Sequence, residues 1–206
     1  MTPAVRGADG RLRCPWAMGA EEYVAYHDME WGVPVRDDAG LYERLSLEAF
    51  QSGLSWLTIL RKRPDFRRAF RGFDPAIVAT FTAEDVDRML VDATIVRNRR
   101  KIEAAVTNAR ATLELGPGGL TRLVWEHAPV PGNGAGGPQQ VPASTPESVA
   151  LAAALRRAGF VFVGPTTIYA LMQACGVVDD HLLECFRRGH AAAGEAGVPR
   201  VGPDLG

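Results

Sequence analysis

The sequence predicts an all-α protein. Apolar residues recur mostly at the three- and four-residue spacing of helices, and the alternation typical of strands is brief, as in "FVFVG" at 160–164. Helix-capping residues precede several of these segments. The chain has 206 residues, of which 47% are hydrophobic, so it can bury a sizeable core.

Ten helices are predicted along the chain. Their approximate ranges are 20–29, 38–52, 55–62, 64–71, 84–91, 97–114, 120–126, 146–158, 166–175 and 179–187. Ser52 and Gly53 break the helical pattern, and a new helix starts at Ser55. The helix at 97–114 has the clearest apolar stripe, which is formed by Ile102, Ala105, Val106, Ala109 and Leu113.

Two further helix starts carry capping patterns. Thr82 precedes Asp85 by three residues in "FTAED", and Thr145 is followed by Pro146 at the first helical position in "STPES". The Gly- and Pro-rich segment 128–143 is predicted to be a loop. Residues 1–13 and 188–206 lack periodicity, so we expect flexible tails on either side of a single domain at 14–187.

The composition excludes some classes of protein. Apolar stretches such as "ALAAAL" at 150–155 fall far short of the roughly 20 residues of a membrane span, and the first residues lack the apolar centre of a signal peptide. We therefore expect a cytoplasmic protein. Its three cysteines are then thiols or metal ligands rather than a disulfide framework.

The distribution of charge is more informative than its sum. The net charge of −1 gives no global attraction to polyanions. However, 61–71 holds six arginines or lysines against one aspartate, and 97–110 holds five against one glutamate. These segments are either solvated helix faces or a local surface that contacts phosphates, and composition leaves both interpretations open.

Four residues near the ends of the predicted domain could hold a metal ion. Cys14 and His27 are 13 residues apart, and His181 and Cys185 have the i, i+4 spacing that places both on one face of a helix. Two thiols and two imidazoles complete a tetrahedral zinc site with no open position. The spacing is wider than in a compact zinc finger, and by pattern alone it is more typical of a partly buried histidine beside a packed thiol. The third cysteine, Cys175, is predicted to be a buried thiol.

An acid interrupts the apolar side of the helix at 38–52. Leu41, Leu45, Glu48 and Ser52 lie on one stripe, so Glu48 is either at a surface margin or buried with a binding partner. Aromatic residues cluster around the first candidate metal ligands, namely Trp16, Tyr23, Tyr26 and Trp31. A carboxylate among such rings could hold a flat, electron-poor heterocycle by stacking and hydrogen bonding.

The segment "VDATIVRNRRKIEAAV" at 91–106 combines a helix end, a tight turn and a basic helix. Helix-hairpin-helix units of this shape bind a DNA strand through turn amides and a helix N-terminus. Such turns usually contain glycine, whereas this one reads Asp92, Ala93, Thr94.

Six segments together resemble one family. They are "CPW" at 14–16, "YHDMEWGVP" at 26–34, "LEAFQSGLSW" at 47–56, "IVRNRRKI" at 95–102, "GFVFVGPTTIY" at 159–169 and "MQACGVVDDH" at 172–181. Their order across 14–187 resembles that of bacterial 3-methyladenine DNA glycosylase I. The resemblance implies a helix-hairpin-helix glycosylase fold, with a lobe of 14–36 and about 165–187 clasped by structural zinc, and a second lobe at about 37–164.

The resemblance also implies roles for individual residues. Glu48 would be the acid of the base pocket, and its aromatic partners would be Trp16, Tyr26 and Trp56. The zinc ligands would be Cys14, His27, His181 and Cys185. Gly53 and Leu54 would enter the duplex where the base leaves, and the basic face with Arg97, Arg100 and Lys101 would meet phosphates. Asp28, Glu30 and Trp31 are assigned to packing and supporting hydrogen bonds.

The activity implied by this resemblance is excision of 3-methyladenine from alkylated double-stranded DNA. A monomer would hydrolyse the N-glycosidic bond and leave an abasic site with an intact backbone, without a lyase step or a nucleotide cofactor. Two other functions fit the same residues: a zinc-stabilised module that binds damaged bases without cutting, and a zinc hydrolase of a small molecule. The second needs an open metal position, which a Cys2His2 set does not provide.

Overall fold

The computed structural model describes residues 3–129 and 141–189, and within these ranges the chain is mostly helical. The α-helices are α1 (Glu21–Met29), α2 (Asp38–Gln51), α3 (Trp56–Ala69), α4 (Pro75–Val78), α5 (Ala83–Val91), α6 (Arg99–Glu114), α7 (Gly119–Trp125), α8 (Pro146–Arg157) and α9 (Pro165–Ala174). Two 3-10 helices, η1 (Pro15–Gly19) and η2 (Arg71–Phe73), and two short strands, β1 (Val5–Arg6) and β2 (Leu12–Arg13), complete the described elements.

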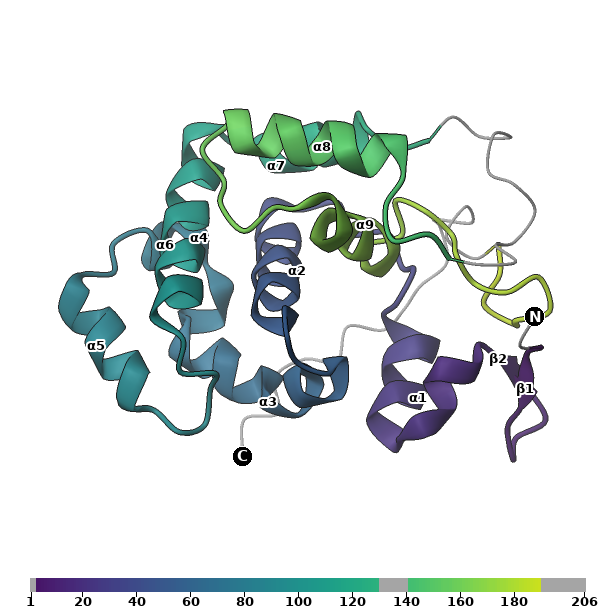
Figure 1. Ribbon diagram of the computed structural model, residues 1–206. Coiled ribbons are helices and arrows are strands. Elements are labelled where there is room, and N and C mark those ends of the chain that lie inside the picture. The colour runs from purple at the N-terminus through teal and green to yellow at the C-terminus, as the bar shows by residue number, and fades with distance from the viewer. Residues whose placement is uncertain (1–2, 130–140, 190–206) are drawn as a thin grey trace.

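Helix α2 is the centre of the fold (Figure 1). It contacts α3, α6, α7 and α9, and its buried residues include Leu41, Tyr42, Leu45 and Phe50. The Tyr42 hydroxyl donates a hydrogen bond to the carbonyl oxygen of Ala105 in α6 at 2.9 Å. Because α2 is covered on several sides, polar residues on it are buried as well.

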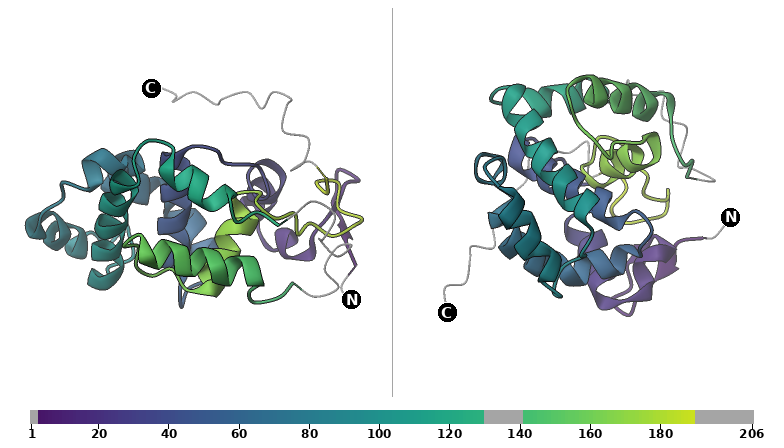
Figure 2. Two further views of the ribbon diagram at one scale, coloured as in Figure 1. Left: turned by 90° about the horizontal axis from the view of Figure 1, so that it is seen from above. Right: turned by 60° about the vertical axis from the view of Figure 1, so that its left-hand side comes forward.

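The molecule is elongated, with α5 at one end and the N-terminal hairpin at the other (Figure 2). Helices α7 and α8 lie beside each other across the top of the view in Figure 1, and α9 runs below α8 toward the N-terminal end. None of the described helices is long and apolar enough to cross a membrane.

The predicted helix caps are confirmed. The Ser55, Thr82 and Thr145 side chains accept hydrogen bonds from backbone amides in the first turns of α3, α5 and α8. Pro146 occupies the first turn of α8. These caps are predictable because each depends on residues within one helical turn.

The buried stripe of α6 is confirmed at four of its five predicted positions. Leu113 differs because it is 49% exposed. Leu113 lies about three turns after Ile102 and so on the same face, but at this end of α6 the buried residues are Ala111 and Thr112 on other faces of the helix.

The prediction of separate helices at 55–62 and 64–71 is wrong. Helix α3 continues through Pro64 to Ala69. Proline removes one backbone hydrogen bond, but Ile59, Leu60 and Phe66 on both sides of it are buried, and this packing offsets the loss. The short helix α4 lies outside the predicted ranges.

The prediction of a helix at 179–187 is also wrong, because this segment consists of turns and bends. The Asp179 carboxylate accepts a hydrogen bond from the His181 amide, and the Phe186 amide donates to the carbonyl oxygen of Leu12. The Arg188 guanidinium donates to the carbonyl oxygens of Asp179 and His181. These backbone groups therefore have partners that a regular helix would not provide.

The N-terminal segment differs from the expected flexible tail. Strands β1 and β2 pair antiparallel, with Val5 opposite Arg13 and Arg6 opposite Leu12. Arg13 is buried and binds the carboxylates of Asp9 and Asp28, which ties this hairpin to α1. Most of the predicted loop 128–143 and of the tail 188–206 lies outside the described residues.

Candidate functional site

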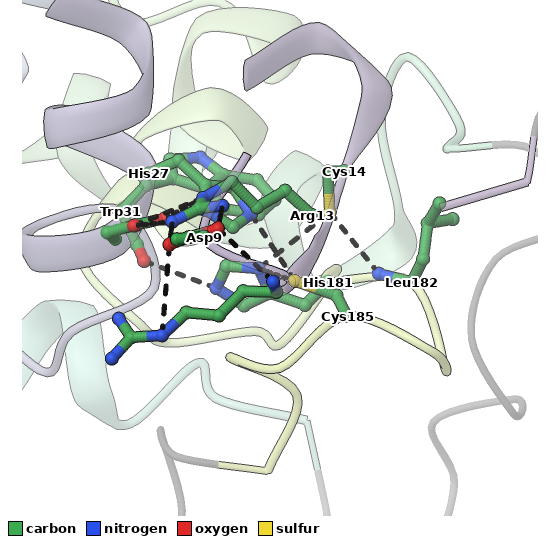
Figure 3. A network of polar contacts seen from close by, with 10 residues as sticks. Asp9, Arg13, Cys14, His27, Trp31, His181, Leu182 and Cys185 are labelled. Atoms are coloured by element: carbon green, nitrogen blue, oxygen red, sulfur yellow. Dashed lines mark hydrogen bonds and ion pairs between the residues drawn. The ribbon is translucent and has the colours of Figure 1, made fainter. Parts of the chain in front are cut away.

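The four predicted metal ligands converge at the N-terminal end of the molecule. Cys14, His27, His181 and Cys185 are all buried, and their potential ligand atoms lie within 4.8 Å of one another. The Cys185 sulfur lies 3.3 Å from Nε2 of His27 and 3.5 Å from Nδ1 of His181. Figure 3 shows both sulfur atoms facing the imidazole rings.

Neighbouring residues orient these ligands. Nδ1 of His27 lies 2.8 Å from the Asp28 carboxylate, an acceptor, which leaves Nε2 to face the sulfur of Cys185. Arg13 donates to both oxygens of the Asp28 carboxylate. The Leu182 amide donates to the sulfur of Cys14 at 3.4 Å (Figure 3). Two thiols and two imidazoles this close together suit a divalent metal of intermediate softness, so the residues fit a bound metal ion.

A close backbone approach brings the C-terminal turns to this cluster. Gly176 follows α9 with a φ of +67°, and a Cβ there would lie 2.6 Å from the carbonyl oxygen of Gly32. Only glycine therefore fits where the chain turns from α9 toward His181. The rings of Trp31 and His27 pack against His181, with centroids 4.6 Å and 4.9 Å away.

A cavity of about 510 Å³ adjoins the metal-ligand cluster. Its lining comes mainly from three parts of the chain: the segment from Cys14 to Trp31, the α2–α3 region and the segment from Ala170 to Leu182. Val141 is the one lining residue outside these parts. Glu48 and all three predicted pocket aromatics line it, together with Cys14, Pro15, Trp31, Gln51, Val141, Ala170, Gln173, Asp180 and Leu182.

Glu48 is the buried acid of this cavity. It lies on α2, is 6% exposed, and its carboxylate has no hydrogen-bond donor among the described residues. Burial raises the pKa of Glu48 to about 8. The alternative of a glutamate at a surface margin is therefore wrong. A buried acid without a partner is costly, so a ligand that donates a hydrogen bond or brings positive charge would be favoured here.

The predicted aromatic residues form one wall. Tyr26 in α1 is buried, and its ring centroid lies 5.4 Å from that of Trp56 and 6.4 Å from that of Trp16. Burial, followed by the charge of Glu48, raises the pKa of the Tyr26 hydroxyl, so it remains a neutral donor. Trp31, which was assigned to packing, both packs against His181 and lines the cavity.

Three polar residues of the lining were not predicted from the sequence. Gln51 follows Glu48 by one turn of α2, a spacing that could have indicated it. The other two are Gln173 and Asp180, which lie on the opposite segment. Oδ2 of Asp180 accepts hydrogen bonds from the Tyr169 hydroxyl at 2.5 Å and from Nε2 of Gln173 at 2.7 Å.

The predicted DNA-contacting residues do not all lie on the surface. Gly53 has a φ of +84° and Leu54 is 41% exposed, both in the loop between α2 and α3. Arg97 and Arg100 are exposed near the start of α6. Lys101 is only 8% exposed, in contrast to the prediction, because its ammonium donates to the carbonyl oxygens of Phe50 and Ser52.

Ion pairs neutralise much of the first basic segment, 61–71. Arg61 pairs with Glu22, Arg63 with Glu30 and Arg67 with Glu43, at distances from 2.6 to 2.8 Å. The supporting role assigned to Glu30 corresponds to its pair with Arg63. For these arginines the interpretation as a helix face with local partners is better supported than a phosphate surface.

A family model described as methyladenine glycosylase matches residues 16–188. The chain belongs to the methyladenine glycosylase family. Similar members are DNA-3-methyladenine glycosylase 1 of Escherichia coli (strain K12), 46% identical over 84% of this chain and 95% of the relative, and DNA-3-methyladenine glycosylase of Haemophilus influenzae, 44% identical over 84% and 96%.

Solved structures of methyladenine glycosylases share the fold. A crystal structure of 3-methyladenine DNA glycosylase I superposes with a TM-score of 0.78 at 44% identity and covers 85% of this chain and 99% of its own. A variant of 3-methyladenine DNA glycosylase I in complex with 3-methyladenine gives 0.76 at 33% identity, covering 85% and 97%. The predicted family and its mainly helical fold are therefore confirmed.

Proposed function

We propose that this methyladenine glycosylase hydrolyses the N-glycosidic bond of 3-methyladenine in alkylated double-stranded DNA. It releases the free base and leaves an abasic site, which is the first step of base excision repair. The observation that carries this proposal is the buried, unsatisfied Glu48 in a cavity walled by aromatic rings.

The chemistry of the cavity suits this base. Adenine methylated at N3 in DNA is a flat cation, and the rings of Trp16, Tyr26 and Trp56 offer stacking faces. The Glu48 carboxylate accepts a hydrogen bond from the exocyclic amine. Since burial raises the pKa of Glu48 to about 8, the acid is largely protonated at neutral pH in the free protein, and the cation favours its ionised form.

Hydrolysis then needs little further assistance. The positive charge already weakens the bond from the base to C1′ of the deoxyribose, so the base leaves with the bonding electrons and becomes neutral. A water molecule forms the new C1′–O bond and loses a proton to solvent. Glu48 holds the base in its reactive orientation through a hydrogen bond. The base can form this bond only after its nucleotide has flipped out of the duplex.

The residues of the cavity favour hydrolysis without a lyase step. A lyase that uses a Schiff base needs an amine in the cavity. The chain has two lysines, Lys62 and Lys101, and neither is among the residues that line the cavity. Water is then the nucleophile, and the DNA backbone stays intact.

Zinc is the metal that we assign to the Cys2His2 cluster. Cys14, His27, His181 and Cys185 would hold one ion, which with four protein ligands supplies structural stability rather than a reactive water. The ion would join the two segments of the first lobe, 14–36 and about 165–187. The second lobe, at about 37–164, would hold a helix-hairpin-helix unit made of α5, the turn at 92–98 and α6. The monomeric state and the cytoplasmic location stay predictions.

Methylated duplex DNA provides the test. Incubation with the purified protein should release 3-methyladenine, identified by chromatography, and leave sites that are cleaved by alkali. Binding of methylated DNA without release of a base would instead support the non-cutting module. Release of another base as the main product would reject the proposed substrate.

A further inference from the structure

The two lysines of the chain bind loop carbonyls. Lys101, in the first turn of α6, donates to the carbonyl oxygens of Phe50 at 2.8 Å and Ser52 at 2.5 Å. Lys62, in α3, donates to the carbonyl oxygens of Thr94 at 2.9 Å and Ala93 at 3.3 Å. The contacts are reciprocal. Lys101 in α6 binds the loop that leads into α3, and Lys62 in α3 binds the turn that leads into α6.

Each ammonium has partners of partial rather than full negative charge. Among the described residues, neither lysine forms a salt bridge with a carboxylate. Lys101 is 8% exposed and lies at the C-terminal end of α2, where the helix dipole favours a cation. Burial lowers the pKa of Lys101, and the two carbonyl oxygens compensate for part of this cost.

Lysine is rare in this chain, which contains 21 arginines and two lysines. An ammonium is compact and directs three donors around one atom, whereas a guanidinium is a larger planar fork. Each lysine reaches two loop carbonyl oxygens through its single Nζ atom. Arg110 and Arg188 also each reach two loop carbonyl oxygens, so what sets the lysines apart is which loops they hold and not the size of the cation.

The two loops carry the residues that meet DNA under the proposed function. Residues 52–54 include the exposed Leu54, and the turn at 92–94 leads to the exposed Arg97 and Arg100. Both loops lie on the lower side of the view in Figure 1. One loop enters the duplex and the turn contacts its phosphates. The distance between them must therefore stay fixed if both are to bind the same DNA.

We propose that Lys101 and Lys62 are positioning residues that hold the 52–54 loop and the 92–94 turn at the separation required for opening the duplex. This inference rests on the proposed function, which brings both loops to DNA. Lys101 keeps Leu54 aimed at the position that the base vacates. Lys62 keeps the turn in place for phosphate contact, so the two lysines affect different steps.

A fluorescent duplex separates these steps. The DNA carries a stable abasic analogue beside 2-aminopurine, whose fluorescence rises when its neighbour is unstacked, and fluorescence anisotropy gives the affinity. We expect Lys101→Met to lower the fluorescence at saturation to the level of Leu54→Ala, with little change in affinity. Lys62→Met should weaken affinity and keep the saturating fluorescence. Turnover on methylated DNA should fall about 10- to 100-fold for Lys101→Met.

Several results would overturn this inference. One is that Lys101→Met gives the same fluorescence at saturation as the wild type. Another is that its fluorescence falls only in proportion to a lower melting temperature. Should Lys101→Met fail to fold, Lys101→Gln keeps two N–H donors without the charge and should give an intermediate signal. A wild-type protein that excises 3-methyladenine but gives no fluorescence rise would contradict the loop assignment while leaving the proposed function intact.

Discussion

Glu48 lies where its charge is poorly solvated, and this single placement connects stability with recognition. The helix that carries it is covered by neighbouring helices, and the cavity side is walled by Trp16, Tyr26 and Trp56. The protein therefore bears the cost of a poorly solvated acid until a cation enters. Such costs are characteristic of binding sites, where the ligand supplies the missing partner.

Replacing the acid should separate binding of DNA from excision. Glu48→Gln keeps the shape of the side chain but loses the charge that favours the cationic base, so excision should fall roughly 100-fold. DNA affinity and metal content should stay as in the wild type, measured by anisotropy and elemental analysis. Glu48→Asp, which keeps the charge but shortens its reach, is the matched control and should retain more activity. Unchanged excision by Glu48→Gln would reject the role of the acid.

The same variant should show a pH-dependent gain in stability. The pKa of Glu48 is raised from 4.5 to about 8, so the folded protein binds the proton more tightly than the unfolded chain. Stability is therefore lost as pH rises from about 4.5 to 8, and glutamine avoids this loss. Urea unfolding should find Glu48→Gln more stable than the wild type by about 3 to 5 kcal/mol at pH 8.5 and little different at pH 4.5. A stability difference that is the same at both pH values would contradict the burial of a charged group.

Helices α3 and α6 are both rich in basic residues, but their positive charges have different partners. The arginines of α3 form ion pairs with α1 and α2, and Lys62 holds the turn before α6. On α6, Arg99 pairs with Asp87, while Arg100 is exposed and lies over the ring of Phe162. The available positive charge is thus concentrated where α6 begins.

A comparison of two exposed arginines tests this difference. Arg100→Ala should weaken duplex binding and reduce the slope of log K against log salt by about one, because one phosphate contact is lost. Arg61, which pairs with Glu22, is the matched control on α3, and Arg61→Ala should leave the slope unchanged. Titrations at several salt concentrations measure both. An equal change for the two variants would place the DNA surface elsewhere.

Over the whole molecule, the site depends on segments from both ends of the described chain. The cavity takes residues from 14–31, from α2 and α3, and from 170–182, and the metal-ligand cluster connects the first of these with the last. Separation of the ends would therefore open the cavity as well as the metal site.

Removing one ligand should show this dependence. His181→Ala should lose the bound metal and lower the melting temperature by about 10 °C, since structural zinc contributes several kcal/mol to folding. His127→Ala is the control, because His127 contacts the Leu123 carbonyl away from the cluster. Calorimetry with metal analysis measures both. A metal-free His181→Ala protein that melts at the wild-type temperature would show that the metal does not stabilise the joined ends.

Local patterns in the chain were enough to predict the start of most helices and the candidate ligands. The caps at Ser55, Thr82 and Thr145 involve neighbours within one turn. The stripe that Glu48 shares with Leu41 and Leu45 left its burial open, and the packing of α2 decided it. The family motifs also identified the three aromatic residues that line the cavity together with Glu48, namely Trp16, Tyr26 and Trp56.

Contacts between distant segments decided the rest. Whether a basic residue is exposed, paired or buried depends on which helix packs beside it, as Lys101 and Arg63 show. The turns at 179–187 replace a helix because Leu12, 174 residues before Phe186, binds its amide, and Asp180 enters the cavity through those turns. The side-chain pattern of a segment indicates which local structure that segment prefers. These outcomes instead come from hydrogen bonds and packing that exist only once the chain has folded.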